Sequence, residues 1–329
     1  MQSGDTVGEA LVTAGEALVS HGFGAGESLG EIVASDPDAL LGTSASTAVS
    51  GRALFPLLVK LIDARENLSI QVHPNNDDAS GLDRLGKTEA WHVLAAEAGA
   101  MLYLGIQPGV DFDDFKTAAA RLDESAAPLM RTIPAQPGIT VLIPAGTIHA
   151  LGAGVMVYEV QQPSDVTYRL DDWGRVDALG QPREMHLEAG FAVSDPASTP
   201  EPIAPVSLRP AVGEHHLLAA CRFFSLERVS LHVGGSLDVG NGDSPTVVTV
   251  IEGAVSIQDL SLTTGMSAVV WPTAGLATLI ATKPMIALVA MIPDLDRDVV
   301  RRVRRANTDP RTIAVLGGST GDVLAAMKP

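Results

Sequence analysis

The stretch Ser69–Asp77, SIQVHPNND, follows the apolar run LFPLLVKLI and has the pattern of a buried strand that ends in polar residues. Residues two apart in a β-strand point to the same face. Gln71 and His73 therefore share one face, and Ile70 and Val72 share the other. Because burying a polar group without a partner costs roughly 1–3 kcal/mol, Gln71 and His73 need partners, and a metal ion is one such partner.

The composition around this stretch predicts an all-β core with tight turns. Of the 329 residues, 46% are hydrophobic, and short runs of Val, Leu and Ile are separated by 32 Gly and 21 Pro. A chain of this length has room for two domains. The Pro-rich segment 195–210, DPASTPEPIAPVSLRP, lacks periodicity and marks the boundary between them.

We therefore expect three parts. Residues 1–200 are predicted to form a catalytic, metal-binding domain with a helical insertion, and residues 205–293 a smaller β domain. The tail, 294–329, has no assigned role. Its first part, DLDRDVVRRVRR, predicts a basic helix, and IAVLGGSTGDVLAAMKP predicts a strand, a glycine loop and a second helix that dock on the body.

Charge and cysteine content exclude several classes of function. The formal net charge is −17, so a basic face for nucleic acid is not expected. The single cysteine, Cys221, excludes an intramolecular disulfide and indicates a reducing compartment. No apolar stretch approaches the roughly 18 residues of a membrane span, and the N-terminus lacks the basic region of a secretory signal. These features predict a cytoplasmic protein that does not bind membranes.

Local patterns predict several elements. Ser28 and Glu31 have the spacing of a helix capping box. The segment 88–106, TEAWHVLAAEAGAMLYLGI, predicts two paired strands with a turn near Glu97–Gly99. DDFKTAAARLDES predicts a helix whose buried side carries Phe115, Ala118, Ala119 and Leu122.

Two further stretches contain candidate metal ligands. GKTEAWHVL places Glu89 on a strand, with Lys87 two residues earlier on the same face, and IPAGTIHALGAG places His149 after a turn. With Gln71 and His73 these residues offer one amide oxygen, two imidazoles and one carboxylate. Such a set without thiolate suits zinc and also accepts Mn, Fe or Co. For each histidine taken alone, the alternative is a core residue held by hydrogen bonds.

Four blocks, FPLLVKLIDARENLSIQVHPNN, GKTEAWHVLAAEAGA, IPAGTIHALGAG and YEVQQPSDVTYRLDDWGR, closely resemble the type I mannose-6-phosphate isomerases of the cupin superfamily, in their short bacterial form. The resemblance runs in order from about residue 7 to 293. It implies a mainly β fold of two cupin-like (jelly-roll) β-barrels with helical insertions. It also implies interconversion of mannose 6-phosphate and fructose 6-phosphate with one zinc per subunit. The ligands it assigns are Gln71, His73, Glu89 and His149, and the catalytic arginine is Arg169.

This reaction moves a proton between C1 and C2 through a cis-enediol, so it needs an acid/base group that reaches both carbons. Glu159 lies with Val157 on an apolar strand face, and burial there is expected to raise its pKa. Glu159 is therefore a candidate proton shuttle; the alternative is that it pairs with Arg169 and orients it. Lys87 is the other acid/base or phosphate-binding candidate, and Arg169 is expected to stabilise the enediolate.

The remaining polar residues are divided between substrate binding and structure. We expect Lys87, Arg169, Gln161 and Arg175 to contact the substrate, with Lys60 and Arg84 as further candidates for the phosphate. Trp91 and Trp173 are expected to pack in the core. Structural roles are expected for the other histidines: His92, His186, His215, His216 and His232.

The chain departs from the family pattern in two places. The family segment that ends in GESWE is absent before VGEALV, so we expect the first barrel strand to be missing and an edge to be unpaired. Asp171 stands where the family has tyrosine. Two other functions compete: a non-catalytic protein that binds sugar phosphate, and a metal-dependent cupin oxygenase, which would not need the Lys87 and Arg169 cations. The expected partner is a small sugar phosphate, and the sequence does not define an oligomeric state.

Overall fold

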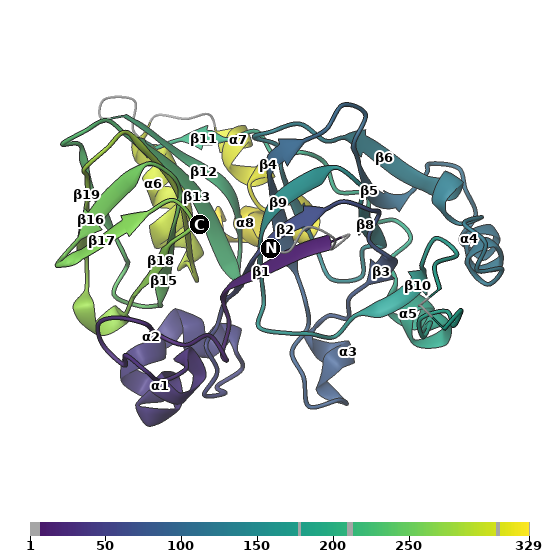
Figure 1. Cartoon of the computed structure of the whole chain (residues 1–329), viewed down its shortest axis with the longest axis horizontal. Coiled ribbons are helices and arrows are strands. Elements are labelled where there is room, and N and C mark those ends of the chain that lie inside the picture. Colours follow the sequence, from purple (N-terminus) through teal and green to yellow (C-terminus); the bar gives the residue numbers. More distant parts are fainter. Residues whose placement is uncertain (1–6, 177–178, 209–212, 307–309, 329) are drawn as a thin grey trace. The chain divides into compact units, whose positions relative to one another are not determined.

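The computed structural model describes residues 7–176, 179–208, 213–306 and 310–328, which form a mainly β structure with four sheets and short helices (Figure 1). None of the helices in these ranges combines the length and the apolar character that crossing a bilayer requires. No closed barrel is found among the described strands. The mainly β prediction is therefore confirmed, and the jelly-roll description is not established by the strand order.

The chain divides into two compact units. The first unit contains the residues up to Ala10, Lys60–Glu159 and Ser164–Pro202; the second contains Leu11–Val59, Val160–Pro163 and the chain from Ile203 onward. This division differs from the sequence-based one, because Leu11–Val59 groups with the second unit rather than with the first. The tail after residue 293 also groups with the second unit.

Two sheets belong mostly to the first unit, to which β1, β2 and β9 contribute most of their residues. One has the order β1-β2-β9-β4-β7, and the other has the order β10-β3-β8-β5-β6. The bounds of the first set are β1 (Val7–Thr13), β2 (Leu58–Ala64), β9 (Val155–Gln161), β4 (Glu89–Ala96) and β7 (Thr140–Ile143). Those of the second set are β10 (Tyr168–Asp171), β3 (Ile70–Val72), β8 (His149–Leu151), β5 (Met101–Ile106) and β6 (Met130–Pro134).

Alternation along the strands creates a core between these two sheets. Trp91 and Val93 from β4 and Val155 and Val157 from β9 join residues of β5 and β8, such as Leu104, in one buried cluster. In each case the alternate residues point to the same face. The next residues on the same face of these strands, Glu89 on β4 and Glu159 on β9, therefore point toward this core as well.

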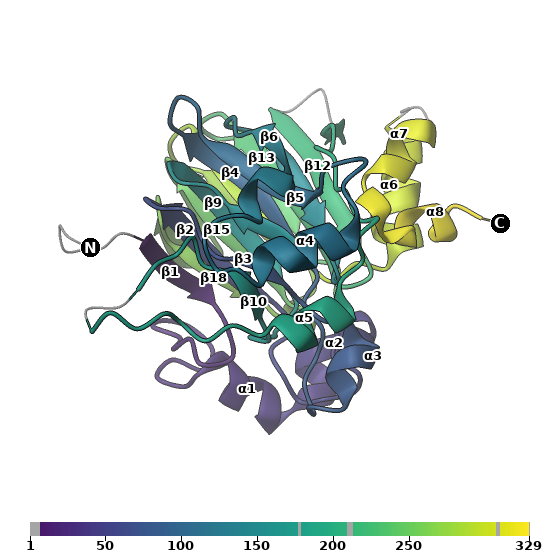
Figure 2. The ribbon, with the colours of Figure 1, turned by 90° about the vertical axis from the view of Figure 1, so that its right-hand side faces the viewer.

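Helices cover the other face of the second sheet (Figure 2). Phe115 and Ala118 of α4 (Phe112–Ala119) pack in one cluster with Ile70, Val72 and Leu170, and α5 (Leu187–Val193) lies against β10 and β3. This packing explains why Gln71, between Ile70 and Val72, points away from the helices and into the space between the sheets. The short helices α3 (Asn76–Ser80) and η1 (Ala127–Leu129) complete the unit.

Two local predictions in this unit are corrected. β4 and β5 follow each other across the expected turn, but they belong to different sheets and do not pair. The predicted helix is present as α4, but Leu122 lies beyond its end at φ +57° and is 40% exposed. In both cases a local pattern is overridden by the packing of the whole unit.

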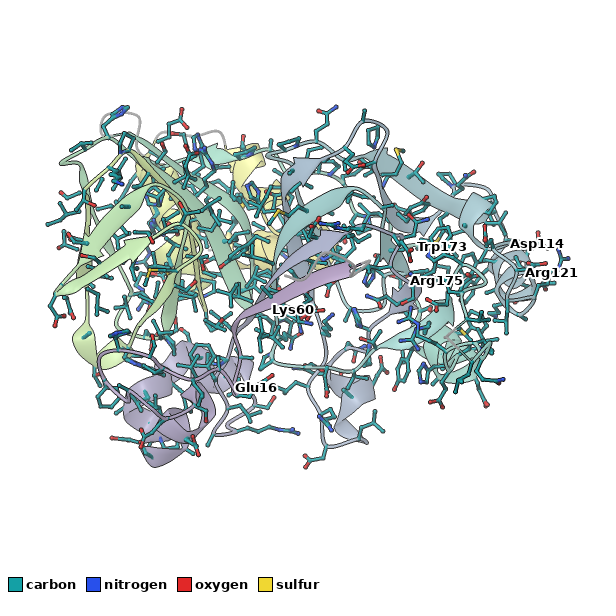
Figure 3. The ribbon with its side chains drawn as sticks, viewed as in Figure 1. Glu16, Lys60, Asp114, Arg121, Trp173 and Arg175 are labelled. Atoms are coloured by element: carbon teal, nitrogen blue, oxygen red, sulfur yellow. The ribbon has the colours of Figure 1, made fainter. Side chains whose placement is uncertain are left out.

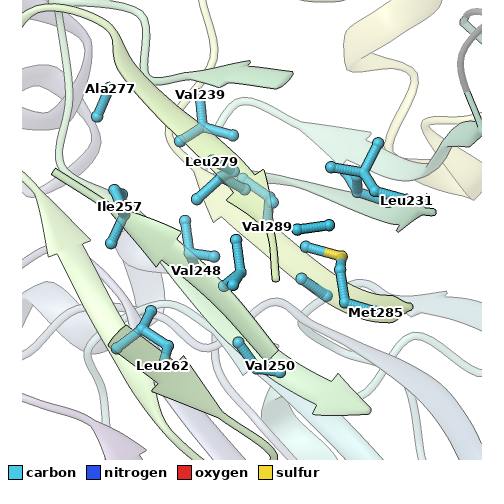
Figure 4. Packing of buried hydrophobic residues seen from close by; sticks show 14 of the residues in the cluster. Leu231, Val239, Val248, Val250, Ile257, Leu262, Ala277, Leu279, Met285 and Val289 are labelled. Atoms are coloured by element: carbon cyan, nitrogen blue, oxygen red, sulfur yellow. The ribbon is translucent and has the colours of Figure 1, made fainter. Parts of the chain in front are cut away.

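The second unit contains the other two sheets, with the orders β11-β12-β13-β20-β15-β18 and β14-β19-β16-β17. The first consists of β11 (Val206–Ser207), β12 (Glu214–Cys221), β13 (Phe224–Leu231), β20 (Met285–Met291), β15 (Thr246–Glu252) and β18 (Ser267–Val270). The second consists of β14 (Ser236–Val239), β19 (Ala277–Ala281), β16 (Ala254–Ile257) and β17 (Leu260–Thr263). Valine, leucine, isoleucine, alanine and methionine side chains alone form the core cluster between them (Figure 4).

Two helices before residue 59 belong to the second unit. In α1 (Leu29–Ser35), Ser28 and Glu31 form the predicted capping box. In α2 (Pro37–Ala48), Gly42 has φ +69°, and a Cβ atom there would lie 2.5 Å from the Asp243 carbonyl oxygen. The Asp243 carboxylate accepts hydrogen bonds from Thr43 N at 2.9 Å and Ser44 Oγ at 2.7 Å. This kink therefore needs glycine and ties α2 to the loop before β15.

The described part of the tail is mainly helical. It contains the π-helix η3 (Leu295–Val300), α6 (Arg301–Arg305), α7 (Pro310–Val315), η4 (Gly318–Thr320) and α8 (Asp322–Ala326). The predicted basic helix is confirmed, but the predicted strand at IAVLG is wrong, since α7 occupies it. Ala220 N of β12 donates to Leu316 O at 2.9 Å, so the tail docks on its own unit.

Candidate metal centre and active site

Strand pairing places three of the expected site residues in one row across the second sheet of the first unit. Arg169 on β10 stands opposite Gln71 on β3, and Gln71 stands opposite His149 on β8. Directly opposite residues of antiparallel strands present their side chains to the same face. The row therefore faces the space between the two sheets, and His73 follows immediately after the end of β3.

The first sheet supplies the facing residues. Glu89 begins β4 and shares the inward face with Trp91, and Glu159 shares the inward face of β9 with Val157. The alternation predicted for both strands thus holds. The next inward residue after Glu89 is Trp91, and the one before Glu159 is Val157. The two glutamates therefore form a polar end to an otherwise apolar core.

His73, Glu89 and His149 meet at this end and could hold a metal ion. Their ligand atoms all lie within 4.8 Å of one another, and the three side chains are buried. His149 Nε2 lies 3.2 Å from Glu89 Oε1, and His73 Nε2 lies 3.5 Å from Glu89 Oε2. It is the one group of three or more His, Cys, Asp or Glu residues with such spacing in the described part of the chain.

Backbone carbonyls fix the orientation of both imidazoles. His73 Nδ1–H donates to Val166 O at 2.9 Å, and His149 Nδ1–H donates to Thr147 O at 2.9 Å. In a neutral imidazole held in this way, Nε2 carries the lone pair. Burial, followed by the charge of Lys87, holds the pKa of His73 well below its usual value, so its ring is neutral at physiological pH. This arrangement of Nδ1–H bonded to carbonyl is typical of histidines that bind metals through Nε2.

Gln71 lies beside the group of His73, Glu89 and His149. Its Nε2 lies 3.4 Å from His149 Nε2, and its Oε1 accepts from Ser69 Oγ at 3.3 Å. The oxygen and nitrogen of a side-chain amide exchange places by a half-turn of the amide group. After that rotation Oε1 takes the place of Nε2, 3.4 Å from His149 Nε2, as an amide ligand beside this imidazole would.

Lys87 is the cation nearest to this group. Its Nζ lies 2.8 Å from Glu89 Oε2 and 3.1 Å from His73 Nε2. Burial alone would lower the pKa of Lys87, but the Glu89 and Glu159 carboxylates outweigh burial and raise it, so the ammonium group stays charged. Burial alone would likewise raise the pKa of Glu89, but Lys87 and His73 hold it well below its usual value.

Glu159 is anchored by a tryptophan. The indole Nε1–H of Trp91 donates to Glu159 Oε2 at 2.8 Å. Burial, reinforced by the Glu89 charge, raises the pKa of Glu159, as its position on an apolar face suggested. The described residues include no hydrogen bond between Glu159 and Arg169. Arg169 instead donates from Nη1 to the Glu184 carbonyl at 2.7 Å.

Two further arginines surround Asp172 near Arg169. Arg175 Nη2 lies 2.5 Å from Asp172 Oδ1, and Arg183 Nε donates to Asp172 Oδ2 at 2.7 Å. Burial, together with the positive charges of Arg183 and Arg175, lowers the pKa of Arg169. No sequence pattern pointed to Arg183, because no spacing rule links residues that meet through a loop. The cluster is one carboxylate among three guanidinium groups.

The other expected substrate contacts are less concentrated. Lys60 Nζ (labelled in Figure 3) lies 2.8 Å from Glu9 Oε1. Arg84 forms an exposed pair with Asp165 at 3.0 Å. Gln161 is the last residue of β9, groups with the second unit and donates from Nε2 to Gln162 O at 3.0 Å. Lys60 and Arg84 each pair with a carboxylate other than Glu89, and the substrate contacts of these three residues stay predictions.

Trp173, His92 and Asp171 have structural partners. Trp173 (labelled in Figure 3) donates from Nε1 to Leu68 O at 2.6 Å, and its ring meets Tyr103 edge-on. His92 bonds Thr140 Oγ1 at 2.9 Å. Asp171, where the family has tyrosine, is buried and accepts from Trp173 N at 2.7 Å. Burial raises the pKa of Asp171.

Comparisons with known proteins agree with the sequence motifs. Residues 2–90 match the family model described as phosphomannose isomerase type I, catalytic domain. Over 208 residues the chain is 34% identical to mannose-6-phosphate isomerase ManA of Bacillus subtilis (strain 168), covering 60% of this chain and 62% of that protein. Over 180 residues it is 37% identical to mannose-6-phosphate isomerase of Streptococcus mutans, covering 54% of each. The aligned part thus spans between half and two thirds of these relatives.

The structural likeness extends further than the sequence match. The crystal structure of mannose 6-phosphate isomerase from Bacillus subtilis superposes with a TM-score of 0.73 at 25% identity, covering 86% of this chain and 89% of that one. A putative mannosephosphate isomerase from Archaeoglobus fulgidus superposes with a TM-score of 0.66 at 22% identity, which indicates a shared fold. It covers 87% of this chain and 88% of that one.

Proposed function

We propose that this chain, whose resemblance to the type I mannose-6-phosphate isomerases these comparisons confirm, is a zinc-dependent aldose–ketose isomerase. It would interconvert mannose 6-phosphate and fructose 6-phosphate through a cis-enediol. The observation that carries the proposal is the buried group of His73, Glu89 and His149, with Lys87 beside it. A buried set of acceptors next to a cation is what charge development on sugar oxygens requires.

The ligand set fits zinc. Two ligands bound to one tetrahedral zinc at about 2.1 Å lie roughly 3.4 Å apart. His149 Nε2 lies 3.2 Å from Glu89 Oε1, His73 Nε2 lies 3.5 Å from Glu89 Oε2, and the Gln71 amide nitrogen, which a half-turn of the amide replaces by the oxygen, lies 3.4 Å from His149 Nε2. We propose one ion per subunit, held by Gln71, His73, Glu89 and His149. When bound, it would polarise the sugar oxygens as a Lewis acid.

Lys87 and the metal compete for one lone pair. The Nε2 of a neutral imidazole has a single lone pair, and in this structure that lone pair of His73 faces Lys87 Nζ at 3.1 Å. A metal bound to His73 therefore excludes this hydrogen bond. Lys87 keeps Glu89 Oε2 as a partner, and its ammonium group is then available to the substrate.

The other residues have the following proposed roles. Glu159 carries the proton between C1 and C2, since its raised pKa brings it closer to the operating pH. Arg169, on the same row as Gln71, stabilises negative charge on the enediolate. Lys87, Arg169, Gln161 and Arg175 bind the substrate.

Arg183 extends this set. It shares Asp172 with Arg175, so a phosphate that approaches one guanidinium also meets the other. The two arginines are aligned by the same carboxylate, which restricts their rotamers before the substrate arrives. Forked guanidinium groups suit the geometry of phosphate oxygens.

The same proposal covers the architecture of the two units, the partner and the cellular location. We propose that the two-sheet units correspond to cupin-like jelly rolls, which the likeness to the Bacillus subtilis structure supports. The partner is a small sugar phosphate. A cytoplasmic location is supported by the single buried cysteine, Cys221, whose pKa burial raises to about 12.

A coupled assay of fructose 6-phosphate formation tests the function. Protein stripped with a chelator is expected to lose turnover and to regain it with zinc. His149→Ala is expected to bind no zinc at micromolar concentration, and Arg169→Ala is expected to bind zinc and yet lose at least about 10²-fold in kcat. Zinc binding without turnover in the unmodified chain would refute catalysis and favour the sugar-phosphate-binding protein.

A further inference from the structure

One buried aromatic residue, Trp91, contacts both the proposed proton carrier Glu159 and the proposed metal ligand His149. Trp91 lies on β4 two residues after Glu89, on the same inward face, and is only 2% exposed. Its indole Nε1–H donates to Glu159 Oε2 at 2.8 Å. Its ring meets the imidazole of His149 edge to face, with centroids 5.4 Å apart and planes at 77°.

We infer that Trp91 is a positioning residue for the proton transfer, which it serves by fixing the Glu159 carboxylate relative to the metal ligand His149. The inference rests on the proposed function, because it assigns Trp91 a task in that reaction. From the sequence, Trp91 was expected only to pack in the core.

The indole N–H of Trp91 fixes one oxygen of the Glu159 carboxylate. An indole N–H can only donate, so it fixes one carboxylate oxygen and cannot take the proton that Glu159 carries. Among the described residues, no other hydrogen bond to Glu159 is found, so the orientation of this carboxylate depends on Trp91. With Oε2 anchored, Oε1 is the oxygen that remains to exchange a proton with the sugar.

The ring of Trp91 is also held by its contact with His149. Edge-to-face contact is a preferred arrangement of aromatic rings, and His149 is also held by its Nδ1–H bond to Thr147 O. The indole is therefore clamped between an imidazole with a fixed orientation and Glu159. A single rigid side chain thus sets the distance between the proton carrier and the metal ligand, and a displacement of about 1 Å at such a point can cost 10²-fold in rate.

The test replaces the N–H and keeps an aromatic ring. In Trp91→Phe we expect bound zinc and KM within twofold of the parent and kcat lower by about 10- to 100-fold. With mannose 6-phosphate deuterated at C2, the kinetic isotope effect on kcat should rise, because proton transfer becomes slower than the other steps. The matched control is Trp173→Phe, which also loses an indole hydrogen bond, to Leu68 O. It should leave the isotope effect unchanged.

A parent-like kcat and isotope effect in Trp91→Phe would overturn the inference. If that variant does not fold, the indole N–H signals of the three tryptophans provide a second test by NMR, assigned through Trp173→Phe and Trp271→Phe. Glu159→Gln should then shift the Trp91 signal alone, and an unchanged Trp91 signal would overturn the inference. If the zinc-loaded parent shows no turnover, the proposed function fails, while the NMR experiment still decides whether Trp91 binds Glu159.

Discussion

Each unit of the chain buries a glutamate beside a histidine, and the surroundings of these two glutamates differ. In the second unit, Glu227 accepts from His215 Nε2 at 2.5 Å and from the guanidinium of Arg302, including Nη2 at 3.0 Å. In the first unit, Glu89 faces the Nε2 atoms of His73 and His149, whose Nδ1–H groups are already used. Glu227 thus accepts from two side chains that act only as donors to it, whereas Glu89 has Lys87 as a donor and faces the Nε2 atoms of two imidazoles.

The partners of the carboxylate distinguish a structural charge cluster from a functional one. Buried charges are stable when donors satisfy them, and Arg302 with His215 does so for Glu227. Three acceptors that converge on one point need a cation, and Lys87 alone supplies one charge to them. A second cation, such as a metal ion, completes the first group but has no place in the second.

The largest expected effect comes from Glu89→Gln. The change removes the negative charge that a divalent ion needs, so zinc binding at micromolar concentration should be lost. We expect kcat/KM to fall by at least about 10²-fold, measured by the coupled assay with zinc content determined on the same sample. Zinc-loaded Glu89→Gln with parental turnover would break the comparison.

Glu227→Gln is the matched variant in the second unit. We expect turnover within twofold of the parent and a loss of about 3 kcal/mol in the free energy of unfolding, since Arg302 is left without its carboxylate. Urea unfolding followed by circular dichroism measures this loss. If turnover and not stability fell, the assignment of the two glutamates would have to be reversed.

Lys87→Met tests whether the Lys87 ammonium group competes with the metal for His73. Removing the ammonium group frees the His73 lone pair and removes a positive charge beside the metal site. Zinc affinity should therefore rise about tenfold, measured by competition with a chromophoric chelator, although turnover falls. The control, Lys116→Met, removes an exposed lysine paired with Asp113 and should leave the affinity unchanged. Weaker zinc binding in Lys87→Met would contradict the competition.

The pH dependence of stability should follow Glu227. Burial alone would raise its pKa, but Arg302 and the hydrogen bond from His215 lower it to about 2, below the unfolded value of about 4.3. The resulting stabilisation, about 3 kcal/mol, is complete above the unfolded pKa and is lost as the pH falls from about 4.3 through about 2. The difference in unfolding free energy between the parent and Glu227→Gln should shrink over that range. A constant difference would show that the carboxylate charge is not the cause.

Arg84→Ala should have the smallest effect. Arg84 is 57% exposed on its side chain and pairs with the still more exposed Asp165. An exposed ion pair typically contributes only about 0.2–1 kcal/mol, so the urea midpoint should change little. A loss comparable to that of Glu227→Gln would show that burial does not decide the value of an ion pair in this chain.

Much of this could be predicted from the sequence, because strand alternation is a local rule. It placed Gln71 with His73 and Glu159 with Val157, and the family resemblance added the partners on other strands. The resemblance and the mainly β class are confirmed. Three of the four expected ligands also lie within 4.8 Å of one another.

What failed depended on contacts that no local pattern encodes. The short apolar run IAVL fits a strand as well as a buried helix, and the packing of the tail made it helical. The turn between β4 and β5 did not make these two strands pair, since they belong to separate sheets. The Trp91–Glu159 bond and the Arg183–Asp172 bond join residues that only the folded unit brings together.

The most direct test of the central claim is an anomalous difference map, recorded at the zinc absorption edge from crystals of the zinc-loaded chain. We predict one peak per chain, within bonding distance of Nε2 of His73 and His149, the Glu89 carboxylate and Gln71 Oε1, with Lys87 Nζ no longer bonded to His73. An absence of this peak, or zinc bound elsewhere while Lys87 keeps its bond to His73 Nε2, would contradict the account.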